Sequence, residues 1–494
     1  MKKFLLTSCW IIIMIGVVFI ASRQFKPKPA EEAKAPDPFE EEIVIEDPEP
    51  STEVSVIDNS AGDKTFTEYI KAGDQYMKEF FFRAAIKEYL AAAKLNPRST
   101  EALYKLGNAY LANNEPEKAK STFEAAKSID PESININLGI VRAYLALRDH
   151  ASAKSILGQL DPNNYDVKFF LAIVAILDDN LDESRDIFQD IWDNAPEDKA
   201  VAKGNASNFL DKFNIFKIYK EAETIQLKTL LAKGMTEAGL YESAIPVLFS
   251  VINEKNNYRD AWIVLGYAYL NTYKNKDAID AFKQAKALDP TNATISFFLG
   301  LSYYADNQFD KAILFIEKAD DLGYKPKSDI DLKLGELYLI KEEYAASANR
   351  YEQYLAENPY DLSLYIRTIY LNIDVLDKPG TALILAQKAV QYHPNAAMSH
   401  NLLGWAQIAN NDFTNAKNNL EKAMNIDPNL ESTYFNLGLL YEEKGIKNLA
   451  MEYYKKAYNI GEGSVMANKA AIKFNQLADN QESQFYQVNT LNSF

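Results

Sequence analysis

Residues 262–290, WIVLGYAYLNTYKNKDAIDAFKQAKALDP, decide the fold of this 494-residue chain. Each half of the stretch places large apolar residues three and four positions apart, which predicts two consecutive helices. Pro290 ends the second helix, because proline disfavours helical conformation in the residue before it. The first helix is apolar on two sides. One side can pack within the repeat, and what covers the other side is a separate question.

The same pattern recurs along the chain with a period close to 34 residues. The aligned glycines are Gly73, Gly107, Gly266, Gly300, Gly335, Gly404 and Gly438. Twelve residues after each comes a small residue: Ala85, Ala119, Ala278, Ala312, Ser347, Ala416 and Ala450. Four residues further stands a large one: Tyr89, Phe123, Phe282, Ile316, Tyr351, Leu420 and Tyr454. Small residues where two helices cross let the backbones approach, while the large residue opposite fills the gap.

This spacing resembles the tetratricopeptide repeat (TPR), whose pattern of Trp, Leu, Gly, Tyr, Ala, Phe, Ala and Pro extends over 34 residues. All eight positions are matched here, by Trp262, Leu265, Gly266, Tyr269, Ala278, Phe282, Ala285 and Pro290. The resemblance implies an all-α superhelical solenoid built from about eleven helix-turn-helix units.

The pattern divides the chain into units at 66–99, 100–133, 134–164, 165–198, 225–258, 259–292, 293–327, 328–361, 363–396, 397–430 and 431–464. Units 1–4 thus occupy 66–198, and units 5–11 occupy 225–464. Unit 3 is three residues short, and unit 9 has Ile369, Tyr370 and Ile373 where Leu, Gly and Tyr are expected. Their local geometry is therefore open.

Two segments fall outside the period. In residues 199–224, the stripe of Phe209, Phe213 and Phe216 predicts an inserted helix at a bend between two subarrays. In residues 465–494 we expect a capping helix and a C-terminal tail, since the last repeat of a solenoid must be closed by a more polar element.

The N-terminus is expected to be a membrane anchor. Residues 4–21, FLLTSCWIIIMIGVVFIA, carry no charge and would span roughly 27 Å as a helix. A cleaved signal peptide is the alternative, but cleavage after Ala21 would need a small residue where Phe19 stands. A lipidated Cys9 is a further alternative, although most of the apolar stretch follows this cysteine.

The orientation of this anchor is less clear, because lysine and arginine residues flank it on both sides. We favour residues 1–3 in the cytoplasm and a single-pass signal-anchor, with the repeats outside the cell membrane, as in a bacterial envelope protein. Residues 22–65 then form an acidic linker rich in Pro and Glu that cannot bury a core.

One face of the first helices is expected to be a groove for partner proteins. In TPR proteins, positions 5, 9 and 12 of each unit line a concave surface that binds peptides. Here these positions are largely apolar and aromatic. They hold Phe169, Ile173, Ile176, Ile263, Tyr267, Leu270, Phe297, Leu301, Tyr304, Leu332, Leu339, Leu371, Trp405, Ile408, Phe435 and Leu439. The alternative, left open here, is that neighbouring helices, the inserted helix or a second copy of the chain cover them.

Other site chemistries find little support. A TPR groove that binds acidic tails needs Lys and Asn at positions 5 and 9, and only Asn108, beside Tyr104, fits, with Lys105 off that face. The net charge of −16 argues against nucleic-acid partners. His150, His393 and His400 lie in different units, and no nucleotide-binding, zinc-protease or serine-hydrolase motif is present. We expect no catalytic residues, no metal and no cofactor.

These features predict a membrane-tethered TPR adaptor or scaffold in cell-envelope assembly, contacting the membrane through residues 4–21, with self-association possible. A cytoplasm-facing TPR adaptor at the inner membrane is an alternative. A different class of function would be an accessory subunit of a glycosyltransferase or of a secretion enzyme complex.

Overall fold

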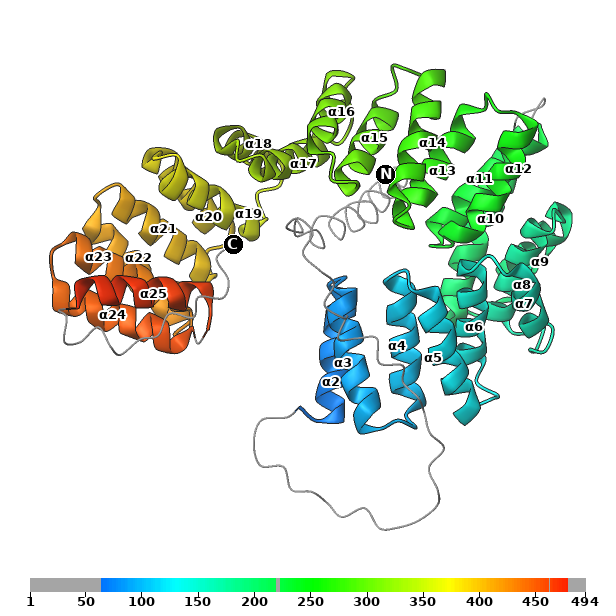
Figure 1. The fold of residues 1–494 in the computed structure, drawn as a ribbon, viewed down its shortest axis with the longest axis horizontal. Helices are drawn as coiled ribbons and strands as arrows, with labels where there is room; N and C mark the ends of the chain where they lie inside the picture. Colours follow the sequence, from blue (N-terminus) through cyan, green and yellow to red (C-terminus); the bar gives the residue numbers. More distant parts are fainter. Residues whose placement is uncertain (1–63, 219–222, 462, 479–494) are drawn as a thin grey trace, which may run out of the picture. The chain divides into compact units, whose positions relative to one another are not determined.

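The computed structural model describes residues 64–218, 223–461 and 463–478. The predicted anchor 4–21 and most of the linker 22–65 lie outside these ranges. Among the described residues, no helix is both long and apolar enough to span a bilayer. These residues form helices that follow one another in chain order, as Figure 1 shows.

The helices come in pairs that coincide with the repeat units. In the first half they are α2 (Phe66–Lys78), α3 (Phe82–Leu95), α4 (Thr100–Ala112), α5 (Pro116–Ile129), α6 (Ile134–Ala146), α7 (His150–Leu157), α8 (Tyr165–Leu177) and α9 (Leu181–Asn194). The short helix η1 (Glu197–Lys199) and the single helix α10 (Ala200–Ile218) follow. The paired helices resume with α11 (Thr224–Glu237), α12 (Tyr241–Glu254), α13 (Arg259–Asn271) and α14 (Asn275–Leu288).

The second half continues in the same way. It contains α15 (Ala293–Ala305), α16 (Phe309–Asp321), α17 (Lys327–Ile340), α18 (Tyr344–Glu357), α19 (Leu362–Tyr370), the π-helical turn η2 (Leu371–Val375) and α20 (Pro379–Tyr392). It ends with α21 (Ala397–Ala409), α22 (Phe413–Ile426), α23 (Glu431–Glu443), α24 (Lys447–Ile460) and the single helix α25 (Val465–Leu477).

Glycine at the helix crossing lets the two helices of seven of the pairs approach closely. A Cβ on Gly266 would lie 2.8 Å from the ring of Phe282, and one on Gly107 would lie 2.6 Å from the ring of Phe123. Both phenylalanine side chains are fully buried. The close approach therefore needs glycine, and the aromatic ring of the second helix fills the space.

The turn within each pair has the same backbone geometry in every unit, which the sequence pattern does not reveal. One residue per turn has a left-handed φ between 50° and 76°, yet glycine occupies only two of these positions, Gly239 and Gly445. In the α4–α5 turn that residue is Asn114, and the N–H of Glu115 donates to the carbonyl of Tyr110 at 2.8 Å. This hydrogen bond satisfies a carbonyl at the helix end and reverses the chain.

The described chain forms two compact blocks. The N-terminal block extends to Thr291 and includes Leu301–Gln308, and the C-terminal block comprises Asn292–Gly300 and the residues from Phe309 onward. The inserted helix α10 packs on α8, α9 and α11, all within the N-terminal block.

Candidate binding surfaces

The first helices of several successive units contact one another within each block. In the C-terminal block, α19 contacts α21, α21 contacts α23, and α23 contacts α25. In the N-terminal block, α4 contacts α6 and α11 contacts α13. A partner groove is predicted at positions 5, 9 and 12 of these helices, and it requires that their side chains be accessible.

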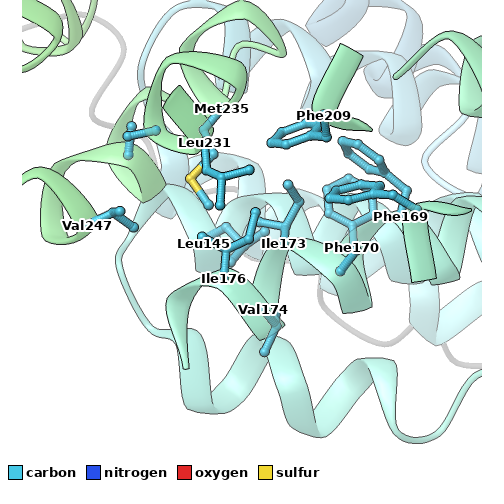
Figure 2. Packing of buried hydrophobic residues seen from close by; sticks show 14 of the residues in the cluster. Leu145, Phe169, Phe170, Ile173, Val174, Ile176, Phe209, Leu231, Met235 and Val247 are labelled. Carbon is cyan, nitrogen blue, oxygen red and sulfur yellow. The ribbon is translucent and has the colours of Figure 1, made fainter. Parts of the chain in front are cut away.

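In unit 4, this face is covered by other helices of the N-terminal block. Phe169, Ile173 and Ile176 are buried, and they belong to one apolar cluster with Phe209 of α10 and Leu231 of α11. Figure 2 shows these side chains converging, together with Met235 and Val247. Helices α10, α11 and α12 therefore cover these three residues. In unit 4 the face is closed by other helices of the chain and is not an open groove.

Aromatic stacking holds the inserted helix against unit 4. The rings of Phe188 and Phe209 are stacked, with centroids 4.6 Å apart and planes 9° apart. Phe169 lies 6.1 Å from each of them. Such contacts add to the free energy gained by burying the rings, so α10 is an integral part of the N-terminal core.

Unit 6 keeps part of its predicted groove accessible. Ile263, Tyr267 and Leu270 are half-buried, and the Tyr267 ring meets that of Tyr241 edge-on at 6.1 Å. Burial raises the pKa of the Tyr267 phenol, and the neighbouring Tyr241 adds to the effect. The phenol therefore stays protonated at neutral pH and acts as a hydrogen-bonding group.

In unit 7, all three predicted groove residues are buried. Phe297, Leu301 and Tyr304 are each less than a tenth exposed. Phe297 stacks on Tyr324, with ring centroids 4.2 Å apart. These side chains pack inside the protein.

Unit 9 differs from the predicted register. Its first helix begins at Leu362 and ends in the π-helical turn η2, which absorbs one additional residue. The predicted groove residue Leu371 is consequently in the core, 2% exposed, whereas Ile366 and Tyr370 are 37% and 38% exposed. Residues 366 and 370 occupy positions 5 and 9 when the unit is counted from Leu362.

The remaining predicted groove residues of the C-terminal block differ in how exposed they are. Leu332, Leu339, Trp405, Phe435 and Leu439 are half-buried, while Ile408 is buried in the core around α23 and α24. We define the C-terminal aromatic face as Ile366, Tyr370, Trp405, Phe435 and Leu439. It lies on α19, α21 and α23, of which α19 contacts α21 and α21 contacts α23.

A lysine of the last helix lies at this face. The Nζ atom of Lys469, on α25, lies 5.4 Å from the centroid of the Tyr370 ring. Within the described chain, Lys469 forms no ion pair. Burial raises the pKa of the nearby Asp374 carboxyl, and Lys469 partly offsets that rise. The face thus combines aromatic rings with one cation that a partner carboxylate can reach.

One polar group was missed by the sequence reasoning. Arg142, at position 9 of unit 3, donates to Oδ1 of Asn108 at 2.7 Å, and Lys105 forms an ion pair with Asp74 at 2.7 Å. Burial lowers the pKa of the Arg142 guanidinium. Arg142 shares its unit position with Asn108, which is the signal that could have identified it.

The described residues contain no group of three or more His, Cys, Asp or Glu side chains placed to hold a metal ion. His400 is buried, with Nε2 2.9 Å from the carbonyl oxygen of Pro394. His150 is half-buried, and burial lowers its pKa. The Nε2 atom of His150 is buried and has no hydrogen-bond partner among the described residues.

Comparison with known proteins agrees with the helix pairs. Tetratricopeptide repeat models match residues 70–134 and 263–324, 144–206 and 431–460, and a TPR repeat model matches 406–445. These matches support assignment of the chain to the tetratricopeptide repeat family. The TPR matches fall in both blocks and include the α6–α9 region.

Curated relatives resemble the chain over part of its length. A TPR repeat-containing protein of Methanocaldococcus jannaschii is 24% identical over 53% of this chain and 52% of its own. Anaphase-promoting complex subunit 3 of Schizosaccharomyces pombe is 22% identical over 40% of this chain and 29% of its own. The peroxisomal targeting signal receptor of Komagataella phaffii is 25% identical over 46% of this chain and 40% of its own. The chain thus spans about half the length of the first of these relatives, and less of the other two.

Solved structures with similar helix pairs include yeast Tom70, at 15% identity and a TM-score of 0.28, aligned over 83% of this chain and 95% of that one. Another is YrrB, a TPR protein with an unusual peptide-binding site. It is 19% identical, with a TM-score of 0.27, and is aligned over 45% of this chain and 96% of that one.

Proposed function

We propose that this protein is a membrane-tethered TPR adaptor that binds partner proteins through the C-terminal aromatic face. The observation that carries the proposal is the accessibility of that face. Its five residues remain partly exposed on contacting helices, whereas the corresponding residues of units 4 and 7 are buried. Trp and Tyr, both present on this face, are enriched among the interface residues that contribute most to protein–protein binding.

The chemistry of the face indicates the kind of partner. Trp405, Phe435 and Leu439 present apolar surface, and Lys469 offers a positive charge beside Tyr370. The ligand that fits is a peptide segment or helix with apolar residues and one acidic residue. The names of the relatives place similar repeats in a targeting-signal receptor and in a multi-subunit complex, which supports protein binding as the activity.

Substitution of the face tests the proposal. Trp405→Ser together with Phe435→Ser should reduce partner capture from a lysate of the native cell by at least tenfold, with unchanged circular dichroism. Ile384→Ser, on α20 and 57% exposed, is the matched control and should leave capture unchanged. Capture that survives the double substitution would assign binding to another surface.

The tether is the second part of the proposal, and it rests on the uncharged segment 4–21. Deletion of residues 4–21 should release the protein from the membrane fraction. Protease added to intact spheroplasts should digest the repeats, because we propose that they lie outside the membrane in the cell envelope. Complete protection would favour the cytoplasm-facing adaptor.

A further inference from the structure

Unit 3 is interrupted on its second helix. The helix α7 has 8 residues, whereas the second helices of the other units have 13 or 14. The connection 158–164 replaces its last turns. In a regular unit, those turns pack against the next first helix, as α5 packs against α6. The shortened helix α7 therefore covers less of α8 than α5 covers of α6.

An open hollow of about 460 Å³ lies beside this connection. It is lined by Pro162 of the connection, by Lys168 and Leu171 of α8, and by Glu183, Asp186, Ile187 and Asp190 of α9. The hollow is open to solvent, and its volume can accept one or two side chains of a partner. Lys168 stands at position 4 of its unit, where Trp262 stands in unit 6.

The charges of the hollow are unbalanced. Lys168 forms an ion pair with Asp190, and its Nζ atom lies 5.1 Å from the Tyr165 ring centroid. Asp186 forms an ion pair with Arg185, which is outside the lining. Within the described part of the chain, Glu183 makes neither an ion pair nor a hydrogen bond. Three carboxylates and one ammonium thus surround an apolar floor of Pro162, Leu171 and Ile187.

We propose that this hollow is a second docking site, which takes a partner segment carrying an apolar side chain flanked by lysine or arginine. The apolar side chain enters between Leu171 and Ile187, and the flanking cations pair with Glu183 and Asp186. The net charge of −16 attracts a basic segment at long range, in the same sense as the local charge. The site lies in the N-terminal block and does not depend on the C-terminal aromatic face.

Calorimetric titration of the full-length protein tests this site. The probe is a blocked nonapeptide with a central leucine between lysines, and the comparison peptide has glutamate in place of each lysine. At 0.15 M salt the lysine peptide should bind and the glutamate peptide should not. Glu183→Lys should weaken binding about tenfold, because it replaces attraction with repulsion at the lining.

Asp182→Lys is the matched control. Asp182 precedes Glu183 on α9, its side chain is 91% exposed, and it is not part of the lining. It should change the affinity less than twofold although the charge change is identical. Lys168→Trp should fill the hollow and abolish binding, with circular dichroism to establish that the variant folds.

Two results would overturn the proposal. Equal weakening by Glu183→Lys and Asp182→Lys would mean that only the overall charge matters. Unchanged affinity of a folded Lys168→Trp variant would place the peptide elsewhere. Trp405→Ser with Phe435→Ser should not affect this titration, so the outcome is distinguishable from that for the C-terminal aromatic face.

Discussion

At the scale of single residues, the glycine at the helix crossing of seven units allows the two helices to approach closely. A Cβ on Gly335 would lie 2.4 Å from Cε1 of Tyr351, and the Tyr351 ring is fully buried. The ring cannot move aside without opening the core. The unit therefore depends on the absence of a side chain at residue 335.

Gly335→Ala should lower the free energy of unfolding by about 1–3 kcal/mol, because the added methyl group overpacks this crossing. Gly204→Ala is the control, since a Cβ there meets nothing within 4 Å. That change in helix α10 should raise stability by about 0.5–1 kcal/mol. Urea denaturation measures both. A neutral Gly335→Ala would show that the helices separate without cost.

Asp329 should make stability depend on pH. Burial raises its pKa to about 6, and the Tyr324 hydroxyl, which donates to the carboxylate, offsets part of that rise. The folded state thus binds this proton more tightly than the unfolded state, whose carboxyl has the ordinary pKa near 3.8. The contribution of Asp329 to the free energy of unfolding is greatest below about pH 4. It falls as the pH rises to about 6 and is constant above that.

Asp329→Asn should remove this dependence and stabilise the protein at pH 7 by roughly 1 kcal/mol, a value reduced for solvent screening. Thermal unfolding at pH 4 and pH 7 measures the effect. If the wild type lost no stability relative to Asp329→Asn between these two values, the assignment of a raised pKa would be wrong.

At the scale of helices, the N-terminal block is held together by turns far apart in the chain. Glu242 of α12 pairs with Arg148 at 2.7 Å and with Lys274 at 2.6 Å. The Asn114 side chain donates to the carbonyl of Thr272 at 3.0 Å. These contacts join the turns of units 2 and 3 to those of units 5 and 6.

Glu242→Ala should loosen this junction, because it leaves Arg148 and Lys274 facing each other without a carboxylate. Hydrogen exchange in turns 147–149 and 272–274 should become faster by at least tenfold. Glu223→Ala is the control, because it removes only the exposed ion pair with Lys255. It should change the free energy of unfolding by no more than about 0.5 kcal/mol and leave exchange in these turns unchanged. Unchanged exchange after Glu242→Ala would mean that apolar packing alone holds the junction.

The helix pairs could be predicted from the sequence because their packing residues repeat, as from Trp262 to Pro290. The register of unit 9 could not, because one extra residue is absorbed by the π-helical turn 371–375 and exposes Tyr370 in place of Leu371. The burial of Phe169 and Ile173 under other helices could not be predicted from the sequence either. It comes from α10 and α11, and nothing in the local pattern of unit 4 specifies those contacts.

At the scale of the whole molecule, the two blocks carry different surfaces. The N-terminal block covers the predicted groove of unit 4 and leaves a hollow of acidic and apolar residues beside α7. The C-terminal block leaves an aromatic face partly exposed, with Lys469 beside it. With both proposed sites occupied, one chain would hold two chemically different partner segments, as a scaffold does.

The central claim is that the C-terminal aromatic face contacts the partner in the cell. The most direct test places a photo-crosslinking amino acid at residue 435, with residue 384 as the control site, and identifies crosslinked proteins by mass spectrometry. The account predicts a specific partner crosslinked from residue 435 and absent from residue 384. The same proteins from both sites, or a partner from residue 384 alone, would contradict it.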